Sequence, residues 1–112
     1  MYWDRLLKMV QEHEIVIDRP KGTNHPRYTH VIYPLDYGYL AGTTTIDGEG
    51  IDIFIGSENT NKIKGIICTI DTIKNDAEIK IMYNCSDRDI DTAIEFLNNE
   101  FMSAVFISNN EW

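Results

Sequence analysis

The sequence contains only two cysteines and no long run of apolar residues. Cys68 and Cys85 are too few and too far apart for a disulfide framework or a zinc ribbon. No apolar run approaches the roughly 20 residues that a membrane-spanning helix needs. The opening residues MYWDRLLK also lack the apolar core of a signal peptide. We therefore expect a cytoplasmic protein with no membrane partner.

Basic residues are scarce as well. Ten lysines and arginines stand against 18 aspartates and glutamates, which gives a net charge of −8. This balance argues against a nucleic-acid partner, because binding to the phosphate backbone needs a surface rich in lysine and arginine. The 112 residues, 43% of them hydrophobic, suffice for a modest core. No repeat or linker divides the chain, so we expect a single domain over residues 1–112.

Hydrophobic periodicity predicts two helices around five short strands. Apolar residues at helical spacing predict helices over residues 2–13 and 87–102. Ser86 followed by Asp89 is typical of a helix N-terminus. Alternating apolar residues predict five strands, over residues 14–18, 37–46, 51–56, 62–70 and 77–83. This order favours an α+β fold that is mainly β, with a small antiparallel barrel or curled sheet over residues 14–83 and flanking helices.

The densest chemical signal is the segment DGEGID at residues 47–52, which places three carboxylates within six residues. Two like charges about 4 Å apart repel by about 4 kcal/mol at an effective dielectric constant near 20. Such a cluster is therefore either solvated apart, as in an acidic hairpin turn, or neutralised by a cation. Oxygen ligands favour magnesium, manganese or calcium over zinc. The position of Asp52 favours the second interpretation, a bound cation, because its isoleucine neighbours place it in a strand and so fix the direction of its side chain.

Two further groups of residues allow both a structural and a functional interpretation. Asp71 and Asp76 bracket the tip of the next predicted hairpin and are most simply turn-forming aspartates. Tyr33, Tyr37 and Tyr39 lie upstream of the acidic turn. Their phenols can hydrogen-bond a phosphate oxygen or a metal-bound water, but aromatic residues in strands are more often part of a core.

The most positive stretch of this acidic chain is the loop that carries Lys21, His25, Arg27 and His30. Such a loop is either a solvated turn or a clamp for an anion. Both interpretations remain open from the sequence.

Taken together, these motifs resemble the soluble, family I inorganic pyrophosphatases. The segment YPLDYGY at 33–39 resembles the family's Y-P-x-x-Y-G-Y segment, and DGEGID at 47–52 resembles its D-G-D-P-x-D signature. Asp71 and Asp76 reproduce the separation of two more metal-binding aspartates. The resemblance covers residues 14–80, the greater part of the chain.

The resemblance implies an OB-like five-stranded barrel, oligomeric assembly, and hydrolysis of pyrophosphate to two phosphates with magnesium, or manganese in its place. It implies four metal ligands, Asp47, Asp52, Asp71 and Asp76. The implied catalytic residues are Glu49, which would help to activate the nucleophilic water, and Tyr37, which would support it. Substrate-binding residues would be Lys21, Arg27, Tyr33, Tyr39 and Asp18. Pyrophosphate would arrive as its magnesium complex, because the acidic chain repels the free anion.

Several positions depart from the family pattern. Glu49 replaces an aspartate, Gly50 replaces a proline, and Glu78 stands where the family has a lysine. The family's tyrosine-lysine pair has no counterpart in residues 95–101, and its basic hairpin is shortened to the loop 21–27. Three alternatives therefore stay open: a non-catalytic module that binds metal or phosphate, a hydrolase of another phosphoanhydride such as a nucleotide, and an acidic structural domain without a site.

Overall fold

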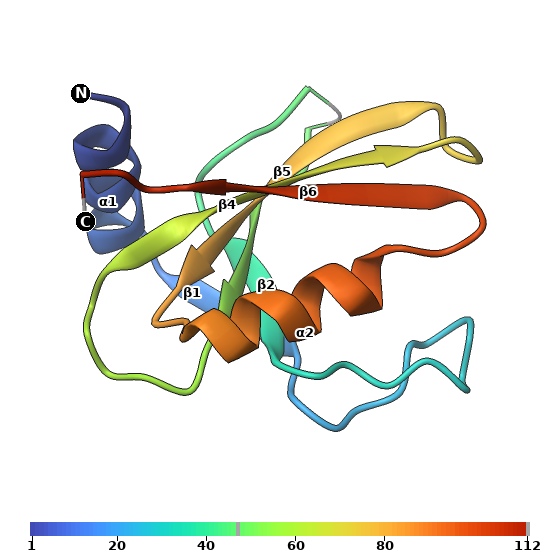
Figure 1. The fold of residues 1–112 in the computed structure, drawn as a ribbon. Coiled ribbons are helices and arrows are strands. Elements are labelled where there is room, and N and C mark those ends of the chain that lie inside the picture. The colour runs from blue at the N-terminus through green and yellow to red at the C-terminus, as the bar shows by residue number, and fades with distance from the viewer. Residues whose placement is uncertain (47, 112) are drawn as a thin grey trace.

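The computed structural model describes residues 1–46 and 48–111 of the chain (Figure 1). In these two stretches the chain forms two helices and six strands, and the fold class is α+β. In order they are α1 (Tyr2–Glu12), β1 (Ile15–Arg19), β2 (Asp36–Leu40), β3 (Ile51–Ile55), β4 (Ile63–Asp71), β5 (Asp76–Tyr83), α2 (Asp87–Leu97) and β6 (Met102–Ser108). Neither of these helices is long and apolar enough to cross a membrane.

The strands form one mixed, open sheet in the order β1-β2-β3-β5-β4-β6. Strands β3 and β5 are parallel, and the other neighbouring pairs are antiparallel. Strand β5 pairs with both β3 and β4, so it lies between them in the sheet although it follows both in the sequence. Strands β1 and β6 are the two edges and do not pair with each other in the described chain. The predicted five-stranded, antiparallel, OB-like barrel over residues 14–83 is therefore wrong, since the sheet has a sixth strand and a parallel pair and does not close.

One helix covers each face of the sheet. The consecutive residues Ile53 and Phe54 of β3 are both fully buried but belong to different cores. Ile53 packs in the core that includes Leu6 and Val10 of α1, and we call this side the α1 face. Phe54 packs in the core that includes Ile90 of α2, on what we call the α2 face. Because successive side chains of a strand alternate between faces, every strand residue can be assigned to one of them.

Most predicted elements agree with the structure to within one residue at each end. The strand predicted over residues 37–46 is shorter and ends at Leu40. There the chain turns, with Gly42 at a φ of +84° and the Thr43 hydroxyl donating to the Leu40 carbonyl at 2.7 Å. Glycine adopts this left-handed conformation without steric cost.

The C-terminal helix, predicted to reach residue 102, ends at Leu97. Asn98 is its C-cap, in an extended conformation. Strand β6, which the sequence analysis missed, begins at Met102, after a short turn. Its sequence MSAVFIS alternates in burial with a period of two, but its serines and alanine weaken the hydrophobic signal.

Asp89 ties the start of α2 to the loop after β3. Its Oδ2 accepts hydrogen bonds from the Ser86 backbone N–H at 2.9 Å and from both the backbone and the hydroxyl of Ser57 at 2.8 Å. The Ser86 hydroxyl in turn accepts from the Asp89 N–H, which completes a capping box at the helix N-terminus that the sequence predicted. Burial alone would raise the pKa of Asp89, but these donors lower it below its usual value.

We expect Asp89→Asn to lower the free energy of unfolding by about 1–2 kcal/mol at pH 7, because it weakens several charge-assisted hydrogen bonds. A carboxylate with a lowered folded-state pKa stabilises the fold above its unfolded pKa and loses this effect as the pH falls through the folded value. Urea unfolding at pH 7 and pH 3 should therefore show a smaller deficit at pH 3. Asp91→Asn, at an exposed position of α2, is the matched control. An equal deficit at both pH values would contradict the prediction.

Candidate functional site

Three neighbouring strands bring polar side chains to one level of the α2 face. In the register of the sheet, Tyr39 of β2 lies opposite Asp52 of β3, and Asp52 lies opposite Lys80 of β5. Tyr37 and Glu78 lie two residues along their strands and so share the same face. The predicted direction of Asp52, away from its isoleucine neighbours, is confirmed, since Ile51, Ile53 and Ile55 all pack on the α1 face.

Lys80 is the centre of this group, and only 5% of its surface is exposed. Its Nζ donates to the Tyr37 hydroxyl at 2.8 Å, to Asp52 Oδ2 at 3.0 Å and to Glu78 Oε2 at 3.3 Å. The ammonium also lies 5.2 Å from the centre of the Tyr37 ring. One buried charge thus joins strands β2, β3 and β5, with a partner for each of its three protons.

The protonation states follow from burial and from these contacts. Burial raises the pKa of Tyr37, so the side chain is a neutral phenol at neutral pH. Burial alone would lower the pKa of Lys80, but Tyr37 and Asp52 raise it overall, so the amine stays charged. The pKa of Glu78 is raised, first by burial and then by the nearby Asp52 carboxylate, against the opposing effect of Lys80. Two carboxylates therefore share a single ammonium, which leaves an excess negative charge.

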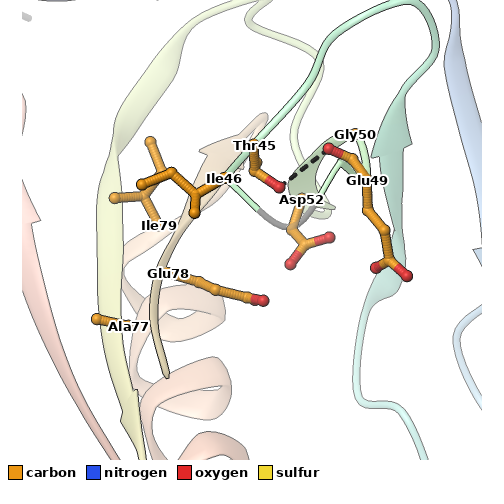
Figure 2. Close-up of a pocket in the computed structure, with 8 residues that line it drawn as sticks. All are labelled: Thr45, Ile46, Glu49, Gly50, Asp52, Ala77, Glu78 and Ile79. Carbon is orange, nitrogen blue, oxygen red and sulfur yellow. Dashed lines mark hydrogen bonds between the residues drawn. The ribbon is translucent and has the colours of Figure 1, made fainter. Parts of the chain in front are cut away.

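A pocket of about 210 Å³ opens beside this pair of carboxylates (Figure 2). It is lined by Thr45, Ile46, Glu49, Gly50, Asp52, Ala77, Glu78 and Ile79. The pocket exists because β5 begins several residues before the level at which β3 joins it, so the loop that leads into β3 lies beside the start of β5. Figure 2 shows the Asp52 and Glu78 carboxylates pointing toward each other and the Glu49 carboxylate on the other side of Asp52. Three carboxylates from two segments thus surround the pocket.

The predicted metal ligands do not all reach this pocket. Asp52 lines it, whereas Asp47 lies outside the described residues. Asp71 and Asp76 face each other at the tip of the β4–β5 hairpin, on the α2 face as well. However, Asp76 is four residues along β5 from Lys80, which corresponds to about 13 Å. The structure therefore brings Asp71 and Asp76 together, but away from Asp52.

Asp71 also has a local structural role. Its Oδ1 accepts hydrogen bonds from the backbone N–H groups of Ile73 and Lys74 at 2.9 and 3.0 Å. These bonds, with that of Lys74 the strongest influence, lower the pKa of Asp71. The side chain thus caps the turn, as the structural interpretation of the sequence expected.

No three His, Cys, Asp or Glu side chains among residues 1–46 and 48–111 gather closely enough to form a metal cage. Magnesium does not require one, because proteins commonly hold it through one or two carboxylates together with substrate phosphates and water. Asp52, Glu49 and Glu78 offer this oxygen chemistry around the pocket. The side chains present therefore offer oxygen donors of the kind that a magnesium ion takes.

The three tyrosines differ in their surroundings. Tyr33 is only 8% exposed, stacks on Tyr37 with ring centroids 5.6 Å apart, and packs against Phe96 of α2 at 5.1 Å. Tyr33 is therefore part of the buried core. The ring of Tyr37 is packed against the core of the α2 face, and its hydroxyl accepts a hydrogen bond from Lys80. Tyr39 is half-buried in the next position along the α2 face.

Two glycines of this region allow neighbouring segments of the chain to approach closely. A Cβ on Gly38 would lie 1.8 Å from the Val16 carbonyl oxygen of β1. A Cβ on Gly50 would lie 2.8 Å from the Leu40 carbonyl oxygen and 2.9 Å from the Tyr39 ring. Both distances are too short for any other residue, so the glycines of the two sequence motifs have a steric reason.

The predicted basic loop is organised around His25. Its Nδ1 accepts hydrogen bonds from the backbone N–H groups of Arg27 and Tyr28 at 3.0 and 3.1 Å. The pKa of His25 is lowered by burial and then by the positive charges of Arg19, Lys74 and Arg27. Cations from strand β1, from the loop and from the tip of the β4–β5 hairpin therefore all act on His25.

The remaining predicted substrate-binding residues lie outside the carboxylate pocket. The Lys21 backbone N–H donates to Asp36 Oδ1 at 2.8 Å, and the residue is exposed. Asp18 is exposed, with its Oδ2 3.6 Å from an Arg19 nitrogen. The structure thus gives these two residues surface positions at the β1 end of the sheet.

Sequence reasoning missed Lys80 and the contribution of Glu78 to the pocket, as well as the positions of Arg19 and Lys74. The sequence contained one signal for the role of Lys80. Lys80 lies in the strand segment AEIKIMY, at even spacing from Met82, which is fully buried. A lysine on the buried side of a strand requires charged or polar partners.

No protein-family model matches the sequence, and a search of curated proteins finds no match.

Proposed function

We propose that this protein hydrolyses inorganic pyrophosphate to two phosphates with the help of magnesium. The observation that carries the proposal is the pocket in which Asp52 and Glu78 share one ammonium while Glu49 adds a third carboxylate. Such an excess of closely spaced negative charge is relieved by a divalent cation. The resemblance of segments 33–39 and 47–52 to the pyrophosphatase motifs supports the same activity.

The chain's own residues would take distinct roles in this reaction. When bound, magnesium supplies Lewis-acid polarisation of the phosphate oxygens and neutralises their charge. Asp52 and Glu49 would hold the ion, and Glu49 would also orient a water molecule and accept its proton. Lys80 would keep Asp52 and Tyr37 in fixed positions through its two shortest hydrogen bonds.

Cations near His25 would bind the phosphates. Arg27, together with Arg19 and Lys74 around His25, offers the positive charge that stabilises a leaving phosphate. We place the activity in the cytoplasm, where free thiols such as Cys68 and Cys85 persist.

The direct test is phosphate release from pyrophosphate by the purified protein with magnesium, with manganese, and with a chelator. We expect release that requires the metal and is lost with the chelator. A panel of nucleoside triphosphates in the same assay would reveal a preference for another phosphoanhydride. Absence of release from every substrate would reject the enzymatic proposal.

A second candidate is a module that binds metal and phosphate without turnover. It is favoured by the position of Asp71 and Asp76, about 13 Å along the sheet from Lys80. Calorimetric titration with magnesium and then pyrophosphate distinguishes the two candidates. Heat of binding without phosphate release would assign the module.

A further inference from the structure

The two edges of the sheet differ in how they are protected. Exposed strand edges invite pairing with another chain, and proteins usually block them with charges, bulges or prolines. Edge strand β1 carries Asp18 and Arg19 and has an irregular register between Ile17 and Arg19. By contrast, residues 101–110, which include edge strand β6, contain no charged residue in a chain that is 25% charged.

The backbone of β6 alternates between its neighbour β4 and the outer edge. The Asn109 N–H donates to the Lys64 carbonyl, and the Thr72 N–H donates to the Phe101 carbonyl, so the odd-numbered residues of this segment face β4. In an antiparallel ladder the intervening even-numbered residues direct their N–H and C=O groups outward. The outer edge is therefore formed by the even-numbered residues of β6.

The first half of this outer edge is blocked by side chains. Asn99 Oδ1 accepts from the Met102 N–H at 2.9 Å, and Asn98 Oδ1 accepts from the Ala104 N–H at 3.1 Å. The second half has no such cap: within residues 1–46 and 48–111, no hydrogen bond joins the outward backbone groups of Phe106 and Ser108 to a partner. The unblocked edge is thus short and sharply defined.

An exposed apolar surface lies next to the unblocked edge. On the α1 face, Val105 and Ile107 of β6 are 60% and 47% exposed, and Ile70 of β4 is 55% exposed. Cys68 and Ile79 continue this surface along a shallow groove of about 340 Å³. Helix α1 covers other parts of the same face, around Leu40 and Ile53. Contiguous exposed apolar surface of this kind commonly marks an interaction site.

We propose that two copies of this chain associate through the unblocked ends of their β6 strands. In an antiparallel pair with Ile107 on the twofold axis, Phe106 of one copy lies opposite Ser108 of its partner. Both residues direct N–H and C=O outward, so the twofold axis generates the same hydrogen-bonded pair twice. The two Ile107 side chains then meet across the axis at about 4.5–5.5 Å between Cβ atoms, and the apolar α1 faces become continuous.

A second copy is favoured over an unrelated partner by charge and by register. Each chain carries a net charge of −8, so two copies can approach closely only through a surface without carboxylates. Residues 101–110 provide such a surface. The spacing of Phe106 and Ser108 around Ile107 is also self-complementary, which an isologous dimer requires and another partner does not.

Sedimentation velocity of the purified protein provides the test. Loading concentrations of about 5–500 µM are suitable, because small interfaces commonly have dissociation constants in the micromolar range. We expect the 13.0 kDa chain to shift toward twice its mass as the concentration rises. Ile107→Lys, which places charge on the axis, should abolish the shift. Ser103→Lys, on the same strand and face but in the blocked half, should leave the shift unchanged.

A substitution that acts on the backbone distinguishes loss of the interface from loss of the fold. Ser108→Pro removes an outward N–H but no hydrogen bond to β4, and proline is tolerated at sheet edges. It should abolish the shift while the circular dichroism melting curve retains its wild-type midpoint. A wild-type chain that stays monomeric to 500 µM would overturn the proposal. So would a dimer that survives Ile107→Lys or Ser108→Pro, or one that Ser103→Lys destroys equally.

Discussion

Asp52→Asn should reduce the rate of magnesium-dependent phosphate release from pyrophosphate by about a hundredfold or more, because losing a group that only supports a metal ligand already costs about 10–100-fold. The substitution keeps the size of the side chain but removes its charge. It thereby removes one of the pocket's three carboxylates and a partner of Lys80 at 3.0 Å. The initial rate of phosphate release at saturating magnesium pyrophosphate measures the effect.

Two variants show whether this loss belongs to the pocket. Asp91→Asn removes an exposed carboxylate from α2 and should leave the rate within about twofold of wild type, as expected for a surface position. Asp71→Asn tests the hairpin aspartate, which caps a turn and lies outside the pocket. Equal losses for Asp52→Asn and Asp71→Asn would mean that the hairpin closes over the pocket when substrate binds. Retention of a third or more of the activity by Asp52→Asn would reject the pocket as the site.

The alternation of apolar residues is sufficient to predict where most strands lie and which way their side chains point. The isoleucines at positions 51, 53 and 55 predict the direction of Asp52 from the sequence alone, because a strand has only two faces. The order of the strands could not be predicted in the same way. The parallel pairing of β3 with β5 depends on where β4 adds to the sheet, and local periodicity carries no information about that choice.

Because local periodicity does not give the order of the strands, the sequence also could not give all of the residues at the site. The resemblance to the pyrophosphatase motifs grouped Asp52 with Asp71 and Asp76 as metal ligands, although from the sequence alone Asp71 and Asp76 are most simply turn-forming residues. The actual neighbours of Asp52 are Glu78 and Lys80, which reach it through the register between β3 and β5. Contacts across a sheet between residues about 28 positions apart are set by tertiary packing, which the spacing of motifs does not encode.

Lys80→Met should lower the free energy of unfolding by about 3 kcal/mol at pH 7, the cost of leaving two partly buried carboxylates without their counter-charge. Methionine keeps much of the volume of the lysine stem, so the loss reflects charge more than packing. Asp52 and Glu78 would then face each other with side chains only 25% and 27% exposed and no ammonium between them. Urea unfolding of the variant and the wild type gives the difference. Lys64→Met is the matched control, because its partner Asp87 is 92% exposed and such a pair contributes at most about 1 kcal/mol.

The pH dependence and a second substitution identify the cause of this loss. Without the ammonium, burial and mutual repulsion raise the folded-state pKa of Glu78 further above its unfolded value. A group with a raised folded pKa binds its proton more tightly in the folded state, so the deficit of Lys80→Met should shrink as the pH falls through that value. Adding Glu78→Gln should restore part of the stability at pH 7, since one of the two facing charges is gone. If the double variant is no more stable than Lys80→Met, the loss comes from packing, and Lys80 does not act as the counter-charge that holds the pocket together.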